Sequence, residues 1–353
     1  MLRPITFDNN TLYMFICFFL VCVTVIYIPL MLFGLLGNIL TILVVWLRPY
    51  MRSSTYLYLS SMAVSDLLIL LLLPLDLYKL WRPRPWPLGD LVCKLTMFLS
   101  ECCTFCTILH ITFLSLERYL AVCWPITAKT VVTRRRTKAV IGCLWLGAAV
   151  SAAPVLIMVG VEEVGGEEVD GGGVAEMDRR ECRCTHHAVT SGLLSAMMIL
   201  SNLYFLVPLC ILGLVYSLIG RTLWLRPKSS RRDQSHRNTV KMLGVIVLAF
   251  VVCWLPFHVG RTIYSFSTHP HHDAHLDFLY YLSQYFNLVS SVLFYLSAAV
   301  NPLLYNLMSA RYRHAVHSLI HTHSHTQAHH LRSTLTNGFV EVGWTDLPQA
   351  EDN

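Results

Sequence analysis

The chain has 353 residues, of which 55% are hydrophobic and 14% are charged, and its formal net charge is +6. A soluble domain carries about 25% charged residues. This composition therefore excludes an ordinary soluble protein and indicates that lipid surrounds much of the chain. Most of the twelve cysteines stand inside apolar runs, where cysteine behaves as a small hydrophobe. The cysteine count does not indicate a disulfide-rich scaffold.

Seven apolar stretches are each long enough to cross a membrane, which takes about 20 residues of helix. They are residues 16–47, 55–81, 91–122, 139–160, 191–223, 240–266 and 278–307. Several stretches contain a proline, and in a membrane bundle the neighbouring helices can satisfy the backbone groups that a proline frees. We interpret the following prolines as kinks: Pro29, Pro74, Pro154, Pro208, Pro256 and Pro302. The predicted fold is all-α, a seven-transmembrane helix bundle.

Charges between the apolar stretches predict the orientation of the bundle. The segments after the first, third and fifth stretches are basic, whereas the segment after the fourth is rich in acids. Basic loops remain in the cytoplasm, so the N-terminus is expected outside and the C-terminus inside. We predict an extracellular N-terminal segment at residues 1–15, a membrane domain at 16–308 and a cytoplasmic tail at 309–353.

Features outside the spans complete this topology. Asn9 begins an Asn-Asn-Thr glycosylation sequon on the predicted outer side. Residues 164–175 are acidic and glycine-rich, a composition that favours disorder. Residues 309–320 are expected to form a short amphipathic helix on the inner leaflet. The tail is rich in histidine, but its spacing defines no tetrahedral site and the tail has no cysteine, so we predict no metal site there.

Short motifs recur in a fixed order along the seven stretches. They are Gly37-Asn38, Asp66, Glu117-Arg118-Tyr119, Trp145, Pro208 with Tyr216, Cys253-Trp254-Leu255-Pro256 and Asn301-Pro302-Leu303-Leu304-Tyr305. One such motif carries little information in apolar sequence, but the ordered set covers nearly the whole chain. The set resembles the signature of the rhodopsin-like G-protein-coupled receptors.

Further segments narrow the resemblance to the ghrelin and motilin receptors. They are Pro74 to Leu77, Arg84-Pro85-Trp86, Glu181-Cys182-Arg183, Tyr216 to Arg221 and Trp254 to Arg261. The segments Thr239 to Leu243 and Val292 to Ala299 are more similar to the ghrelin receptor. Two features depart from it: the loop after the fourth span is longer, and Cys184 stands where proline is expected.

This resemblance implies a plasma-membrane receptor that binds a ghrelin-like peptide outside and a heterotrimeric G protein of the Gq class inside. A motilin-like ligand is the alternative. Membrane lipid is an expected partner and nucleic acid is not. The sequence has no HExxH, P-loop or GxSxG motif and no clustered nucleophile, so an enzyme is not expected. A transporter would show internal repeats and half-helices at the midplane, and neither is visible.

The resemblance assigns an activation switch at the inner end of the bundle. Arg118 would pair with Glu117 at rest and turn toward the G protein, with Tyr216 and Tyr305, in the active state. The alternative is an arginine that only anchors its helix end at the interface. The full set expected to act in switching is Glu117, Arg118, Tyr119, Tyr216, Trp254, Asn301, Pro302 and Tyr305.

Asp66 lies in mid-membrane, where a carboxylate is costly and therefore functional by default. The resemblance implies a sodium ion at Asp66 in the resting state, with Asn38, Ser297 and Asn301 as neighbours. The alternative is a protonated acid in a structural hydrogen-bond network. Trp254 and Phe257 belong to an aromatic stripe that either relays ligand contact or only packs.

The outer part of the bundle contains three predicted charges at similar depth: Asp76, Glu101 and Arg261. An ionisable group within a membrane protein faces the interior and has a partner, so we expect Glu101 to pair with Arg261. Asp76 is then left to bind a cationic group of the ligand. Phe257 and His258, close to Arg261, complete the predicted ligand site.

Two cysteines on the predicted oxidising side should form a disulfide. We expect Cys93, at the outer end of the third span, to bond with Cys182 in the following outer loop. Cys184 could compete for Cys93.

Overall fold

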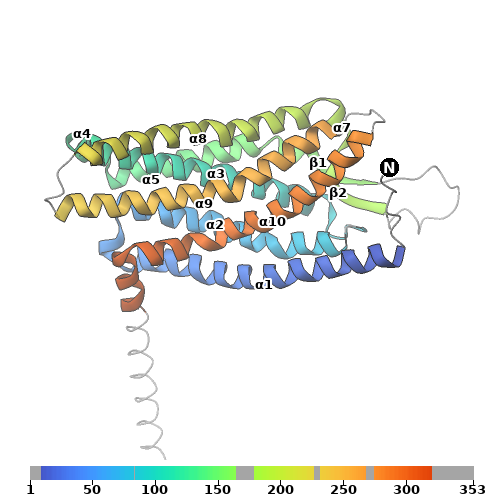
Figure 1. The fold of residues 1–353 in the computed structure, drawn as a ribbon, viewed down its shortest axis with the longest axis horizontal. Helices are drawn as coiled ribbons and strands as arrows, with labels where there is room; N and C mark the ends of the chain where they lie inside the picture. The colour runs from blue at the N-terminus through green and yellow to red at the C-terminus, as the bar shows by residue number, and fades with distance from the viewer. Residues whose placement is uncertain (1–8, 83, 164–178, 226–230, 268–273, 320–353) are drawn as a thin grey trace, which may run out of the picture.

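The computed structural model describes residues 9–82, 84–163, 179–225, 231–267 and 274–319. Within these residues, seven long helices run along one axis and form a single bundle (Figure 1). They are α1 (Asn9–Leu47), α2 (Ser54–Trp81), α3 (Gly89–Cys123), α5 (Arg134–Ala152), α8 (Leu193–Leu225), α9 (Arg231–Ser267) and α10 (Ala274–Met308). The predicted seven-helix bundle is thus confirmed.

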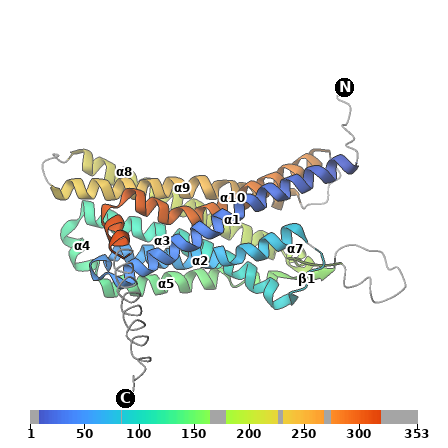
Figure 2. The same ribbon diagram turned by 90° about the horizontal axis from the view of Figure 1, so that it is seen from below.

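Short elements cap the two ends of this bundle. They are η1 (Pro49–Met51), α4 (Pro125–Val131), α6 (Val155–Met158), β1 (Val159–Glu163), β2 (Arg180–Cys184) and α7 (His186–Thr190). Strands β1 and β2 pair in antiparallel fashion, with Val161 opposite Cys182. Figures 1 and 2 place β1 and α7 at one end, which we call the hairpin end, and α4 at the other, which we call the α4 end.

Five of the described helices are long and apolar enough to cross a membrane by themselves: α1, α2, α3, α8 and the segment Arg134–Met158, which contains α5 and α6. Helix α9 contributes a shorter apolar segment, Val247–Ile263. Helix α10 contributes Val289–Leu307. Its continuation, Ala310–Leu319, turns away by 96°.

The fourth predicted span, 139–160, differs from the structure at both ends. Helix α5 begins at Arg134 because Thr133 caps it: the Thr133 hydroxyl accepts from the backbone N–H of Arg136. The helix ends at Ala152, before Pro154, and β1 begins at Val159. Pro154 interrupts the helical hydrogen bonds between α5 and α6, since proline has no N–H to donate. Ala153 and Pro154 both keep helical backbone angles and Arg134–Met158 remains one span, which agrees with a kink. The other five prolines listed above lie inside their helices, as predicted.

The remaining predicted ends are close to the observed ones, except at the N-terminal side of α1 and α9. Helix α1 begins at Asn9, seven residues before the predicted start at 16, and so includes the sequon asparagine. Glycosylation of Asn9 stays a prediction. The segment expected to be disordered, 164–175, and the tail beyond Leu319 lie outside the described residues.

The apolar side chains divide between the interior and the lipid-facing surface. Trp254, Tyr58, Tyr295 and Tyr305 are fully buried in the main core between the helices. Many large apolar side chains on α1, α5 and α8 are instead exposed, which is the pattern expected of helices in contact with lipid.

Two glycines let α1 approach its neighbours closely. A methyl group on Gly34 would lie 2.6 Å from a Leu70 methyl carbon, and one on Gly37 would lie 2.9 Å from Pro302. Small residues at such crossings are common between membrane helices, because they let the backbones meet. The Gly37-Asn38 motif therefore places Asn38 against α10.

The segment Ala310–Leu319 is the amphipathic helix predicted for residues 309–320. Its apolar face, with Tyr312, Ala315 and Leu319, packs into the main core. The Tyr312 hydroxyl lies 2.8 Å from the Thr41 hydroxyl of α1. Arg313 donates to the carbonyl of Leu307 at 2.7 Å. These contacts hold the helix across the end of the bundle.

Candidate functional site

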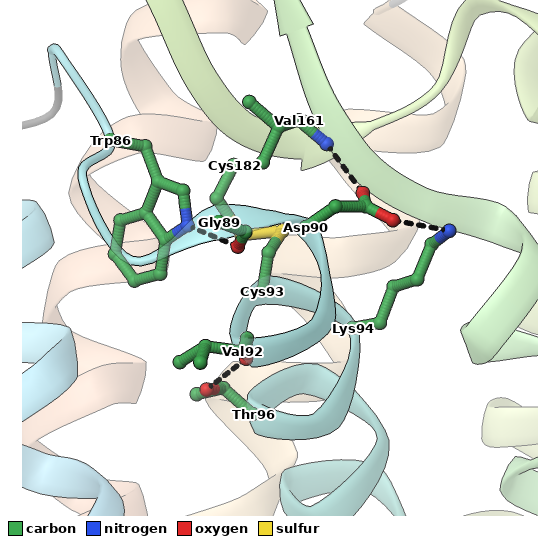
Figure 3. Close-up of a disulfide and its surroundings, with 9 residues drawn as sticks. All are labelled: Trp86, Gly89, Asp90, Val92, Cys93, Lys94, Thr96, Val161 and Cys182. Carbon is green, nitrogen blue, oxygen red and sulfur yellow. Dashed lines mark hydrogen bonds and ion pairs between the residues drawn. A yellow bond between two sulfur atoms is a disulfide. The ribbon is translucent and has the colours of Figure 1, made fainter.

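A disulfide fixes the hairpin to the bundle. Cys93 in the second turn of α3 is bonded to Cys182 of β2, with 5.6 Å between their Cα atoms (Figure 3). Beside it, the Asp90 carboxylate accepts from the backbone N–H of Val161 at 3.0 Å and pairs with Lys94 at 2.6 Å. The predicted Cys93–Cys182 pairing is confirmed, and α3 holds both strands of the hairpin.

The competing cysteine is not bonded to Cys93. Cys184 is a free, half-buried thiol on β2. Burial raises the pKa of this thiol, and the nearby Glu162 carboxylate raises it further. Since the thiolate is the species that attacks a disulfide, a protonated Cys184 does not readily exchange with the neighbouring bond.

Glu101 and Arg261 form the predicted ion pair between α3 and α9. One terminal nitrogen of Arg261 lies 2.9 Å and 3.1 Å from the two Glu101 carboxylate oxygens. Glu101 is buried, with 8% of its surface exposed. The guanidinium also lies 5.0 Å from the ring centre of Phe257, a cation–π contact. The charges are thus paired with each other in the hairpin half of the bundle.

His258 is a buried side chain whose ring nitrogens no other described residue binds. It is 4% exposed, and neither ring nitrogen has a hydrogen-bond partner among the described residues. Its ring stacks on Phe205 at 4.5 Å and meets Phe257 edge-on at 5.4 Å. A buried polar group without a partner costs free energy, so His258 is suited to receive a ligand group.

The partners that the structure gives Asp76 among the described residues are other than Glu101 and Arg261. The Asp76 carboxylate accepts a hydrogen bond from the hydroxyl of Tyr295 on α10 and interacts electrostatically with Lys79. The Lys79 amine lies 5.2 Å from the ring centre of Trp86 and has no hydrogen-bond partner among the described residues. Sequence reasoning missed Tyr295 and Lys79, although Lys79 stands one helical turn after Asp76.

Aromatic rings connect the hairpin half to the middle of the bundle. Trp254 is almost fully buried, and its ring centre lies 5.2 Å from that of Phe294 and 5.9 Å from those of Phe250 and Phe257. A change at Phe257, next to the ion pair, therefore reaches Trp254 by direct contact.

Asp66 is 1% exposed and accepts a hydrogen bond of 2.9 Å from the Asn301 side chain. The other predicted neighbours are turned to backbone groups: Asn38 donates to the Ala298 carbonyl at 3.0 Å and Ser297 to the Phe294 carbonyl at 2.7 Å. A small cavity of about 20 Å³ adjoins this region. Its lining includes Thr107, Trp254, Ser297 and Asn301. Thr107 was missed by the sequence analysis.

At the α4 end, Glu117 and Arg118 do not form an ion pair with each other among the described residues. The Ser54 and Tyr58 hydroxyls donate to the Glu117 carboxylate. The Thr137 hydroxyl lies 2.8 Å from that of Ser54 and 3.5 Å from a Glu117 carboxylate oxygen. The Nε of Arg118 is buried without a hydrogen-bond partner. Glu117 still interacts electrostatically with Arg118, and the switch role of the two residues stays a prediction.

The remaining switch residues surround this end of the bundle. The Tyr216 hydroxyl lies 3.4 Å from that of Ser115, and Tyr216 interacts electrostatically with Arg118. Tyr305 is buried and its hydroxyl has no partner among the described residues. The Tyr119 hydroxyl accepts a long hydrogen bond of 3.4 Å from the Trp124 indole. Pro302 packs against Gly37.

Three features together define a transmembrane receptor. They are the seven helices, the disulfide between α3 and the hairpin, and the buried aromatic and polar groups that connect the two ends of the bundle. The family model of the seven-transmembrane receptors of the rhodopsin family matches residues 37–305. The chain therefore belongs to the rhodopsin family.

Individual relatives define the subfamily. The chain is 52% identical to the growth hormone secretagogue receptor type 1 of Sus scrofa over 304 residues, which covers 84% of this chain and 80% of that protein. The Homo sapiens receptor of the same name is 51% identical with the same coverage. The Homo sapiens motilin receptor is 43% identical over 342 residues, which covers 85% of this chain and 81% of that protein.

These similarities show a peptide-type G-protein-coupled receptor of the growth hormone secretagogue and motilin receptor subfamily. It is a multi-pass plasma-membrane protein and not an enzyme. Its partners are of two general kinds, a peptide ligand and a G protein.

Proposed function

We propose that this receptor binds a ghrelin-like acylated peptide at the hairpin end and activates a Gq-class G protein at the α4 end. The observation that carries the proposal is the buried Glu101–Arg261 pair with Phe257 and His258 beside it. Charges and aromatic rings side by side suit a peptide that presents both polar groups and an apolar chain. The greater identity to growth hormone secretagogue receptors than to the motilin receptor supports the same choice.

The test is calcium release in cells that express the chain, challenged in parallel with acylated ghrelin, non-acylated ghrelin and motilin. We expect a response to the acylated peptide at the lowest concentration, and block of Gq should remove it. Motilin acting at a lower concentration would favour the alternative ligand. A response that persists when Gq is blocked would contradict the coupling.

The proposed orientation places the α4 end in the cytoplasm. A groove of about 610 Å³ at this end is lined by Arg52, Arg134, Arg135 and Lys138 together with the apolar side chains of Val45, Trp46 and Leu57. Acidic headgroups of the cytoplasmic leaflet attract basic residues next to membrane helices. The groove supports an inward α4 end and contact with membrane lipid there.

The resting receptor is proposed to hold a sodium ion near Asp66. The groups present fit such an ion, because Asp66, Thr107, Ser297 and Asn301 all offer oxygen atoms and a hard cation prefers oxygen. The carboxylate would supply the negative charge, and the ion would stabilise the packing between α2, α3 and α10 when bound.

Asp66→Asn should make agonist affinity insensitive to sodium, because the amide carries no charge to hold the cation. In the unmodified receptor, sodium should weaken binding of a labelled agonist relative to an equal concentration of choline. Agonist affinity is measured with each salt on membranes that contain either receptor. An unchanged sodium effect in Asp66→Asn would contradict the site.

A further inference from the structure

A hydrogen bond between Asn202 and Thr262 joins helices α8 and α9 close to the proposed ligand site. The side-chain nitrogen of Asn202 lies 3.1 Å from the Thr262 hydroxyl oxygen. The Thr262 hydroxyl gives its own proton to the backbone carbonyl of His258, one turn earlier in α9, at 2.7 Å. The hydroxyl oxygen therefore accepts from Asn202, and the bond runs from α8 to α9.

The surroundings of the two side chains favour this bond. Asn202 lies in the apolar segment Leu193–Leu225 of α8, and Thr262 lies in the apolar segment Val247–Ile263 of α9. Both side chains are partly buried. Lipid chains offer no hydrogen-bonding groups, so an amide at this position gains more from a partner on a neighbouring helix than from exposure to the membrane.

Thr262 directly follows Arg261, whose guanidinium pairs with Glu101 of α3. Successive side chains of an α-helix point in directions about 100° apart, because the helix has 3.6 residues per turn. Helix α9 is therefore attached to α3 on one side and to α8 on another. Two attachments in different directions restrict the rotation of α9 about its axis more than either does alone.

A ring contact between α8 and α9 lies within one turn of this bond on both helices. Phe205, one turn after Asn202, stacks on His258 with 4.5 Å between the ring centres. Two proposed ligand-site residues, His258 and Arg261, thus lie in the turn of α9 that Thr262 fixes to α8. A rotation of this turn would move both side chains.

We propose that Asn202 and Thr262 are positioning residues, whose hydrogen bond holds α9 in the rotation at which Arg261 pairs with Glu101. Groups in a binding site must be held to within about 0.5 Å and 10–20° of the productive geometry by the residues around them. The proposal rests on the proposed ligand site. Asn202 and Thr262 act on it through Arg261, without themselves contacting the peptide.

Thr262→Val and Asn202→Leu should each raise the EC50 of acylated ghrelin about fivefold, because each removes the hydrogen bond with little change in side-chain size. The double variant should lose no more than a single variant, since both substitutions remove the same bond. Thr262→Ser keeps the hydroxyl and should retain the potency of the unmodified receptor. Calcium release is measured at equal surface expression.

Two controls distinguish positioning of Arg261 from a general effect on the fold. Thr112 of α3 also donates to a carbonyl of its own helix, that of Ile108, at 2.8 Å. Thr112→Val therefore loses the same kind of bond within a helix and should leave the EC50 unchanged. In a Glu101→Gln receptor, where the ion pair is already broken, adding Thr262→Val should raise the EC50 no further.

Thermal unfolding of the purified, ligand-free receptor tests the same coupling without an agonist. We compare the Tm of Glu101→Gln, of Thr262→Val and of the variant with both substitutions. The combined loss of Tm should be smaller than the sum of the two single losses, because the hydrogen bond then has no ion pair left to hold. Additive losses would mean that the bond and the pair stabilise the receptor independently.

Three outcomes overturn the proposal: unchanged EC50 in both Asn202→Leu and Thr262→Val, an equal effect of Thr112→Val, or additive losses of Tm. Failure of the proposed function is a different result. If no ghrelin-like or motilin-like peptide elicits calcium release from the unmodified chain, the ligand assignment fails. The Tm comparison then still decides whether Asn202 and Thr262 position Arg261.

Discussion

Glu101→Gln is expected to lower agonist potency by about 100-fold. Removing one partner of a buried ion pair costs about 3–5 kcal/mol, because the other charge is left unpaired, and 100-fold corresponds to about 2.7 kcal/mol. We expect an effect slightly below this range because Arg261 keeps 20% of its side chain exposed and retains its contact with Phe257. Potency is measured as calcium release at equal surface expression.

A matched control distinguishes this pair from an exposed one. Lys94→Gln on the same helix removes the partner of Asp90, but both side chains are about a third exposed or more, and such pairs contribute about 0–1 kcal/mol. We expect less than a tenfold change in potency. Equal effects of Glu101→Gln and Lys94→Gln would show that burial of the Glu101–Arg261 pair does not matter.

Variants of Asp76 and Glu101 distinguish a role in ligand binding from a role in holding α3 and α9 together. If Asp76 binds the free amine of the peptide, Asp76→Asn should weaken that peptide and leave the weaker binding of an N-acetylated peptide unchanged, whereas Glu101→Gln should weaken both. The structure adds a sharper variant: Tyr295→Phe removes the hydroxyl that Asp76 now accepts from and should strengthen binding of the free-amine peptide. Unchanged binding of that peptide by Asp76→Asn would exclude Asp76 as the partner of the amine.

The span positions and two of the pairings could be predicted because they follow from local or global physical constraints. A membrane demands about 20 apolar residues for each helix, which located the seven helices within a few residues at most ends. Cysteines on the oxidising side of a membrane form disulfides, which predicted the bond between Cys93 and the cysteine of the following loop. A buried carboxylate needs a cationic partner, which predicted the pairing of Glu101 with Arg261.

Partners that depend on side-chain direction between helices could not be predicted. Nothing in the sequence indicates that Tyr295 reaches Asp76, since the two residues stand 219 positions apart. Likewise, Glu117 directly precedes Arg118 in the sequence, but only the packing of α2 against α3 shows that the Ser54 and Tyr58 hydroxyls donate to the Glu117 carboxylate. Strand β1 was hidden because its first residues are as apolar as the end of a span.

Arg118→Ala is expected to abolish agonist-driven calcium release while the receptor still reaches the cell surface. Loss of a buried cation usually destabilises a protein because it leaves an unpaired anion. Here Glu117 keeps the hydrogen bonds that it accepts from the Ser54 and Tyr58 hydroxyls, and Arg118 forms no ion pair among the described residues. The fold should therefore tolerate the change, and the loss should fall on contact with the G protein.

Arg118→Lys tests whether charge alone is sufficient. Lysine keeps the positive charge but lacks the planar, five-donor guanidinium, so we expect it to restore only part of the response. Surface expression is measured by antibody labelling of an N-terminal epitope, and agonist binding on intact cells shows that the pocket is formed. Two results would contradict this role of Arg118. One is a normal calcium response from Arg118→Ala; the other is loss of its surface expression with full activity of Arg118→Lys, which would make the residue a structural cation at the helix end.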